Sequence, residues 1–174
     1  DLHFLDSELA YQGVMDGTLE MAIVTLAPHP VEQLQVVELW RDRLCFVCAK
    51  DHPLAQRSRA DDKPLSLAEL CEVNCILPGA KTFTRTLIGQ RFEEAGLNLP
   101  VSMSTNYLET LKMMCGVGLG WSLLPEKMLD SELVALPVDT APIHRPLGYL
   151  VHNNRTLSNA ARKMIEQLEA NRET

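Results

Sequence analysis

The sequence predicts an α/β fold, because short apolar runs alternate along the chain with segments that carry helix signals. Residues 20–24 form a nearly continuous apolar run, which is typical of a strand buried on both faces of a sheet. A helical segment that begins at Ser7 and ends at Gly17 precedes this run, and residues 2–5 form a short extended run before the helix. A strand, a crossover helix and a second strand favour a parallel sheet.

The middle of the chain continues this alternation. Residues 36–39 and 43–49 are predicted as two strands, because the polar residues Arg41 and Asp42 interrupt the apolar pattern. The other elements expected here are a surface loop at residues 50–64, a short helix at 65–70 that Ser66 caps, and a strand at 74–77.

Two later helices have well-marked beginnings. Thr82 can cap a helix over residues 82–95, which Gly96 closes. Asn106 is predicted to cap the next helix, because Glu109 follows it at the spacing of a capping box. The remaining elements are strands at residues 101–104, 119–124, 133–136 and 147–152, a short helix that Pro125 opens, a proline-containing connector at 137–146, and a final helix that Ser158 caps.

Length and composition narrow the class of protein. A chain of 174 residues is long enough for one domain or for two small lobes. Hydrophobic residues make up 46% of it, and no apolar run approaches the roughly 18 residues of a membrane span, so we expect a soluble protein. The net charge of −7 disfavours binding of nucleic acid through the overall field of this segment. Five cysteines and the absence of a secretory leader favour reduced thiols and a cytoplasmic protein.

Two motifs resemble functional sites, but their context argues against that chemistry. Gly116, Gly118 and Gly120 resemble the glycine pattern of a dinucleotide-binding motif. That motif follows a strand and begins a helix, whereas these glycines are predicted to end a helix and precede a strand. Cys45 and Cys48 have C-x-x-C spacing, but in a strand their side chains point to opposite faces. We therefore expect no nucleotide, metal or other cofactor. The sequence also contains none of the common hydrolase, metalloprotease or phosphate-loop motifs, so it gives no positive reason to propose an enzyme.

The beginnings of the two later helices suggest a binding site. Each helix, near Thr82 and near Asn106, follows a predicted strand, and in open α/β sheets such helix starts face the same crevice. Free backbone amides at a helix start attract anions such as carboxylates. The alternative is that both are simply well-capped helices, and the residues alone leave the two interpretations open.

Three segments together resemble the effector domains of LysR-type transcription regulators. Residues 16–24, DGTLEMAIV, resemble the family's L-x-x-G-x-L-D-L-A-I segment, and residues 51–55, DHPLA, match its H-P-L-A loop. Residues 105–125, TNYLETLKMMCGVGLGWSLLP, match its V-x-x-G-x-G-x-x-x-L-P stretch. The order and spacing of these segments over nearly the whole chain make the resemblance specific.

The resemblance implies a particular form of the α/β fold. We expect two Rossmann-like lobes joined by two crossovers, as in type 2 periplasmic binding proteins. Residues 1–33 and 142–174 would form the first lobe, without the strand and helix with which the family's first lobe begins. Residues 34–141 would form the second lobe.

The resemblance also implies a ligand site with no catalytic residue and no metal ligand. A small, anionic or amphipathic effector would lie in the cleft between the lobes, held by hydrogen bonds from polar residues and by apolar contacts from Phe83 and Leu119. The full set of implied ligand-binding residues is Ser7, Thr25, Gly79, Thr82, Phe83, Thr105, Asn106 and Leu119.

The family pattern further implies how such a protein acts. The regulator would be a homodimer or tetramer, and it would contact DNA only through a winged helix-turn-helix domain upstream of this segment. The peroxide-sensing branch of the family has reactive cysteines where this chain has Thr82 and Arg91, so a thiol-redox trigger is not expected. Two other classes share the scaffold: a periplasmic solute-binding protein of a transporter, and an enzyme.

Overall fold

The computed structural model describes residues 1–29, 31–61 and 63–172, and the chain divides into two compact units. Unit 1 comprises Asp1–Asp42 and Arg145–Thr174, and unit 2 comprises Arg43–His144. Both boundaries fall inside strands, one in β2 (Leu34–Ala49) and the other in β7 (Ile143–His152). Residues 34–42, which the sequence placed in the second lobe, are therefore part of unit 1, and residues 142–144 are part of unit 2.

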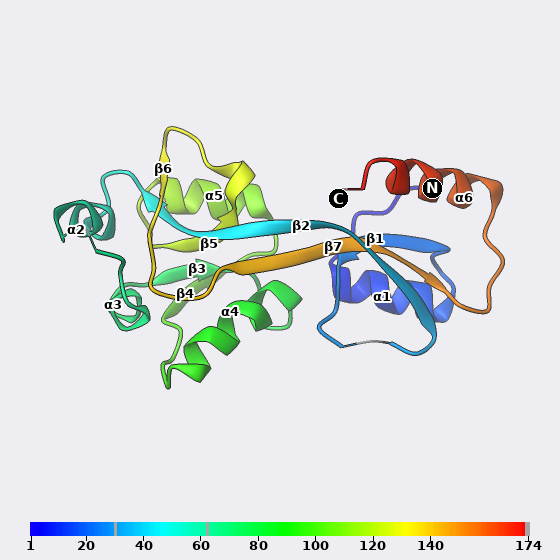
Figure 1. The fold of residues 1–174 in the computed structure, drawn as a ribbon, viewed down its shortest axis with the longest axis horizontal. Helices are drawn as coiled ribbons and strands as arrows, with labels where there is room; N and C mark the ends of the chain where they lie inside the picture. Colours follow the sequence, from blue (N-terminus) through cyan, green and yellow to red (C-terminus); the bar gives the residue numbers. More distant parts are fainter. Residues whose placement is uncertain (30, 62, 173–174) are drawn as a thin grey trace. The chain divides into compact units, whose positions relative to one another are not determined.

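Unit 1 contains α1 (Ser7–Asp16), β1 (Met21–Thr25) and α6 (Asn159–Ala170) beside its portions of β2 and β7 (Figure 1). The strand expected at residues 2–5 is wrong, since these residues form no regular element and Phe4 is 91% exposed. The parallel strand–helix–strand unit expected at residues 2–24 therefore does not form in this described part of the chain. β1 instead pairs antiparallel with β7.

Unit 2 holds the remaining elements, built around three strands that run in the same direction. β3 (Cys75–Leu77) pairs parallel with β4 (Val101–Ser104), and a parallel bridge joins Cys75 to Trp121 just before β5 (Ser122–Pro125). β2 pairs antiparallel with both β5 and β6 (Leu133–Ala135). The helices of this unit are α2 (Pro53–Asp61), α3 (Leu67–Cys71), α4 (Phe83–Glu94), α5 (Leu108–Gly116) and the 3-10 turn η1 (Glu126–Met128).

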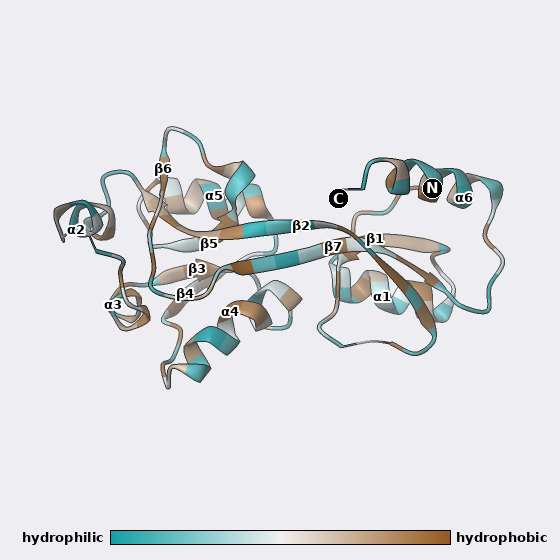
Figure 2. Ribbon diagram, viewed as in Figure 1, coloured by the Kyte–Doolittle hydropathy of each residue, from teal (hydrophilic) through white to brown (hydrophobic). Residues whose placement is uncertain are grey.

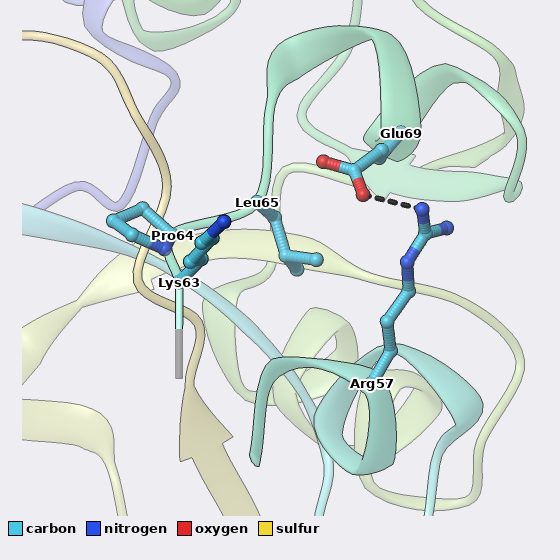
Figure 3. Close-up of a pocket in the computed structure, with 5 residues that line it drawn as sticks. All are labelled: Arg57, Lys63, Pro64, Leu65 and Glu69. Carbon is cyan, nitrogen blue, oxygen red and sulfur yellow. Dashed lines mark ion pairs between the residues drawn. The ribbon is translucent and has the colours of Figure 1, made fainter. Parts of the chain in front are cut away.

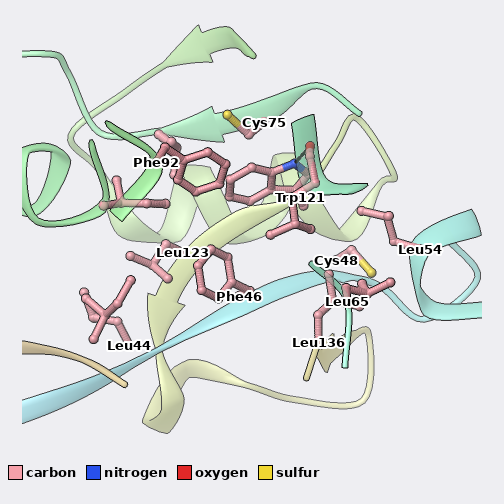
Figure 4. Close-up of a cluster of buried hydrophobic side chains, with 14 of the residues drawn as sticks. Leu44, Phe46, Cys48, Leu54, Leu65, Cys75, Phe92, Trp121, Leu123 and Leu136 are labelled. Atoms are coloured by element: carbon pink, nitrogen blue, oxygen red, sulfur yellow. Dashed lines mark hydrogen bonds between the residues drawn. The ribbon is translucent and has the colours of Figure 1, made fainter. Parts of the chain in front are cut away.

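The core of unit 2 is organised around Trp121 (Figure 4). Its ring stacks on Phe92 with centroids 5.9 Å apart and lies 5.7 Å from the ring of Phe46. The indole Nε1–H donates to the carbonyl oxygens of Leu70, at 2.9 Å, and Val73, at 3.0 Å. A buried tryptophan with a satisfied N–H thus ties the α3 region to the strands.

Several expected elements are confirmed by their capping residues. Thr82 caps α4, Ser158 caps α6, and Ser66 forms a full capping box with Glu69 at α3. Gly17 ends α1 in the left-handed conformation, with φ at 87°. These signals are local, so the sequence alone is enough to place them.

Three further expectations about elements are wrong. Residues 50–64 are not only loop, because α2 forms there. Figure 2 shows α2 as mostly hydrophilic, yet Leu54 and Ala55 are buried and anchor it. The predicted break at Arg41 and Asp42 does not occur, and β2 runs through it. The strand expected at residues 119–124 begins only at Ser122, since the preceding residues form a turn.

Among the described residues, no helix is both long enough and apolar enough to cross a membrane.

Candidate functional site

Two loops of unit 2 leave the same edge of a parallel strand pair. Leu77, at the end of β3, lies opposite Ser104, at the end of β4, and α4 and α5 begin a few residues further on. The Thr105 N–H donates to the carbonyl oxygen of Leu77 at 3.3 Å, so the second loop starts against the end of the first strand. The two helix starts therefore lie at one edge, as the sequence predicted.

Thr82 fixes the first loop to the first turn of α4. Its hydroxyl donates to the carbonyl oxygen of Gly79 at 2.9 Å and accepts a hydrogen bond from the N–H of Arg85 at 3.2 Å. The Thr82 N–H also donates to the Gly79 carbonyl, at 3.0 Å. This loop is thus held in one conformation by a residue that is itself half-buried.

Asn106 connects the two loops. Its side-chain oxygen Oδ1 accepts a hydrogen bond from the Gly79 N–H at 2.9 Å. The prediction that Asn106 caps α5 is wrong, because the residue at the N-cap is Tyr107, which makes no side-chain cap, and the expected box with Glu109 does not form. The Asn106 side chain instead accepts a hydrogen bond from a backbone amide of the neighbouring loop, and sequence spacing cannot reveal such a contact.

Arg85, which the sequence analysis did not single out, lies in the first turn of α4. Its Nη1 is buried and finds no hydrogen-bond partner among the residues that the structure describes. Burial lowers the pKa of the Arg85 guanidinium from its ordinary value. A cationic residue in the first turn of a helix is electrostatically unfavourable, and that unusual placement was the available signal.

The other predicted residues of unit 2 are placed differently. Phe83 is half-buried at the first position of α4, next to Thr82. Leu119 is 49% exposed and lies at the opposite end of the strands, because the Trp121 N–H donates to the carbonyl oxygen of Asn74, which precedes β3. The structure therefore does not bring Leu119 to the loops that carry Gly79 and Asn106.

Ser7 and Thr25 meet within unit 1. The hydroxyl oxygen of Ser7, the first residue of α1, accepts a hydrogen bond at 3.0 Å from the N–H of Thr25, the last residue of β1. One helical turn further on, Tyr11 Oη accepts from the Ala27 N–H at 2.9 Å, and burial raises the pKa of this phenol. Tyr11 was also missed, although its spacing of four residues from Ser7 places both on one face of α1.

Two pockets in unit 2 lie away from these loops. One, of about 290 Å³, is lined by residues of the α2 and α3 region (Figure 3). In it Arg57 forms ion pairs with Glu69 and, at 3.6 Å, with Glu72. The other, of about 320 Å³, is lined by residues 49–53, 116–118 and Glu132. Neither includes a residue that the sequence proposed for ligand binding.

The described part of the chain shows neither a cluster of metal ligands nor, at three buried cysteines, thiols suited to reaction. No group of three or more His, Cys, Asp or Glu residues there is placed to hold a metal ion. Burial raises the pKa of Cys48 to about 11 and those of Cys75 and Cys115 to about 12. Thiols with such pKa values remain protonated at neutral pH and are poor nucleophiles.

The fold matches solved structures of bacterial regulatory domains. The regulatory domain of CcmR from Synechocystis PCC6803, solved in complex with 2-PG, superposes with a TM-score of 0.84 over 100% of this chain and 83% of that one, at 21% identity. The effector-binding domain of QuiR in complex with shikimate gives a TM-score of 0.80 over 95% of this chain and 78% of that one, at 15% identity. The α/β fold is therefore the type 2 periplasmic-binding-protein-like fold, which confirms the expectation from the resemblance.

The family model of the LysR substrate binding domain matches residues 1–173, and the chain belongs to this family. A probable nitrogen assimilation transcriptional activator of Synechococcus elongatus is 28% identical over 84% of this chain and 48% of its own length. The transcriptional regulator CbbR of Xanthobacter flavus is 26% identical over 95% of this chain and 46% of its own length. The chain spans about half the length of the curated relatives it matches.

Proposed function

We propose that this chain is the effector-sensing part of a LysR-type transcription regulator and that its effector is a small anion. Its family comprises substrate-binding domains, and the relatives it matches are transcriptional regulators. Two structural neighbours carry small molecules, 2-PG and shikimate. Binding, rather than turnover, is the proposed activity.

The observation that carries this proposal is the hydrogen bonding between the two loops that precede α4 and α5. Asn106 accepts from the Gly79 N–H and Thr82 donates to the Gly79 carbonyl oxygen. These two hydrogen bonds position the starts of α4 and α5 next to each other. Within the described residues the Tyr107 side chain does not cap α5, and the amides at an uncapped helix start are suited to an anionic ligand. Two helix starts, together with Arg85 in the first turn of α4, whose Nη1 has no partner among the residues that the structure describes, favour a carboxylate or a phosphate.

Ser7 and Thr25 are proposed as the ligand contacts of unit 1. The Ser7 oxygen accepts from Thr25, which leaves the hydroxyl able to act as a donor to an effector oxygen. Thr105 and Phe83 complete the proposed set in unit 2, as a polar and an apolar contact. Leu119 is outside the proposed set, because it lies at the opposite end of the strands.

The wider role follows from the relatives. We propose that the regulator acts in the cytoplasm as a homodimer or tetramer, and that a separate DNA-binding domain contacts DNA, without cofactor. Support comes from the regulators that this chain matches over about half of their length. The net charge of −7 agrees with a segment that does not itself bind DNA.

Calorimetric titration with a panel of small carboxylates and phosphates, including 2-PG and shikimate, tests the site. We expect one or more of these to bind, and Thr82→Ala to weaken that binding by roughly tenfold, the effect of losing about one hydrogen bond, because the Gly79 loop then lacks the hydroxyl that positions it. Ser158→Ala is the matched control, since Ser158 caps α6 with the same 3.2 Å geometry in unit 1. Thr82→Ser should retain binding.

Two outcomes would overturn the assignment. Binding that is equally affected by Thr82→Ala and Ser158→Ala would attribute the loss to general destabilisation. Binding that neither substitution affects would place the site elsewhere, with the pocket beside Arg57 as the next candidate.

A further inference from the structure

An ion pair joins the two chain segments that connect the units. Asp42 is the last residue of unit 1 on β2, and Arg145 is the first residue of unit 1 on β7. The Arg145 Nη2 donates to Asp42 Oδ2 at 2.7 Å. Both connecting strands are therefore fastened to each other at the position where the chain passes from one unit to the other.

This pair is far less exposed than its neighbour on the same strand. The side chains of Arg145 and Asp42 are 12% and 16% exposed, whereas those of Arg41 and Glu38 are 62% and 36% exposed. A surface pair such as Arg41–Glu38 contributes little, because water screens it. A pair held away from water interacts more strongly, and removal of one partner leaves an uncompensated charge.

The strands that carry the pair pack closely. A Cβ atom added to Gly148 of β7 would lie 3.0 Å from the Cα of Glu38 in β2 and closer still to the carbonyl oxygen of Val37. Three residues from the ion pair, the two backbones thus leave no room for a side chain. One strand cannot shift relative to the other without changing the geometry at Asp42 and Arg145.

The pair leaves part of its hydrogen-bonding capacity unused. Arg145 Nε is buried and has no partner among the described residues, although a guanidinium can offer two parallel N–H groups to one carboxylate. A side-on arrangement, in which Asp42 accepts from Nε as well as from Nη2, would satisfy this donor.

We propose that Asp42 and Arg145 form a latch on the connecting strands, and that the latch sets how easily the two units change their relative orientation. The proposal rests on the proposed function, because an effector acts on a regulator by favouring one of two arrangements. The backbone at Asp42/Arg43 and His144/Arg145 is where such a change takes place. The free energy of the Asp42–Arg145 ion pair thus contributes to the equilibrium between the two arrangements of the units, the same equilibrium that the effector shifts.

The test needs no effector and so is independent of the ligand assignment. Fluorescent probes on genetically encoded residues at the exposed positions Gln12, in unit 1, and Glu93, in unit 2, report the distribution of distances between units by single-molecule energy transfer. Hydrogen exchange reports opening of the connecting strands. We expect Arg145→Met to broaden the distance distribution and to speed exchange at residues 40–45 and 143–148 by roughly tenfold or more.

Arg41→Met is the matched control, since it removes an exposed ion pair from the adjacent position of β2. It should change neither measurement. Should Arg145→Met fail to fold, the charge swap Asp42→Arg with Arg145→Asp tests the same pair, and a narrow distribution in the swapped protein supports the latch. The proposal is overturned when Arg145→Met lowers the midpoint of unfolding but leaves the distance distribution unchanged, when the swapped protein folds with a broad distribution, or when Arg41→Met has the same effect as Arg145→Met.

Discussion

The side-chain oxygen of Asn106 lies 2.9 Å from the backbone nitrogen of Gly79, and this single hydrogen bond links two loops that are 27 residues apart in the chain. The same glycine carbonyl accepts from the Thr82 hydroxyl. A side chain at position 79 would meet Asn106, because a Cβ there would lie 3.1 Å from Oδ1. The geometry of both helix starts thus depends on a small residue and an amide.

Asn106→Ala removes this link between the loops. We expect the free energy of unfolding in urea to fall by about 1 kcal/mol, the usual contribution of one hydrogen bond, and the binding of a small anion to weaken. Asn106→Asp retains an oxygen acceptor toward the Gly79 N–H and should be closer to the wild type in stability. An alanine variant with unchanged stability would show that the contact does not hold the loops together.

Arg85→Met separates stability from binding. The guanidinium has a buried nitrogen without a partner among the described residues, so its replacement by an apolar chain should leave the midpoint of thermal unfolding unchanged or raise it. Affinity for carboxylates should fall at the same time, because the first turn of α4 loses its cationic side chain. A loss of stability together with unchanged affinity would contradict a ligand-directed role for Arg85.

Trp121→Phe tests the centre of the unit 2 core. The substitution leaves two carbonyl oxygens without the indole N–H and opens space between Phe46 and Phe92, so we expect the free energy of unfolding to fall by about 2–4 kcal/mol. Chemical denaturation measures the change. Trp40→Phe is the control: the Trp40 indole donates to the Asn171 carbonyl at an exposed position, and its loss should cost much less.

The capping box at α3 predicts a pH dependence of stability. Hydrogen bonds from the Ser66 N–H and hydroxyl lower the pKa of Glu69 below its ordinary value, and Arg57 lowers it further. A carboxyl with a lowered folded pKa stabilises the protein above its unfolded pKa, and this stabilisation is lost as the pH falls through the folded pKa.

Glu69→Gln should therefore destabilise the protein near pH 7, and the difference from the wild type should shrink as the pH falls below about 4.5. Urea denaturation across this range measures both proteins. Glu72→Gln, which removes the more distant partner of Arg57, is the control. A difference that stays constant down to pH 3 would mean that Glu69 contributes through shape and not through its charge.

The sequence predicted elements well where the determinants are local. Thr82, Ser158 and Ser66 were placed as caps because the capping hydrogen bond spans only three residues. The three segments that resemble the LysR-type family correctly predicted the fold. Errors arose where a distant contact decides the outcome, as in β2, whose polar Asp42 stays inside the strand because Arg145 lies beside it.

The candidate site shows the same limit. The sequence placed Thr82 and Gly79 near the second helix start, but it assigned Asn106 to a local cap, because nothing in the spacing shows that the Gly79 amide is within reach. Leu119 was chosen from the family pattern, and only the strand pairing shows that it lies at the far end. A cation in the first turn of a helix is unusual, and this was the only local sign of Arg85 in the sequence.

The division of the chain also fixes an order of assembly during synthesis. Unit 2 is one continuous segment, Arg43–His144, and it has all of its strands once that segment has left the ribosome. Unit 1 is completed only when the segment that begins at Arg145 has also been translated, because β1 pairs with β7 and α6 packs against these strands. Until then residues 1–42 lack their partner strand, and the unpaired backbone of β1 is open to pairing with other chains.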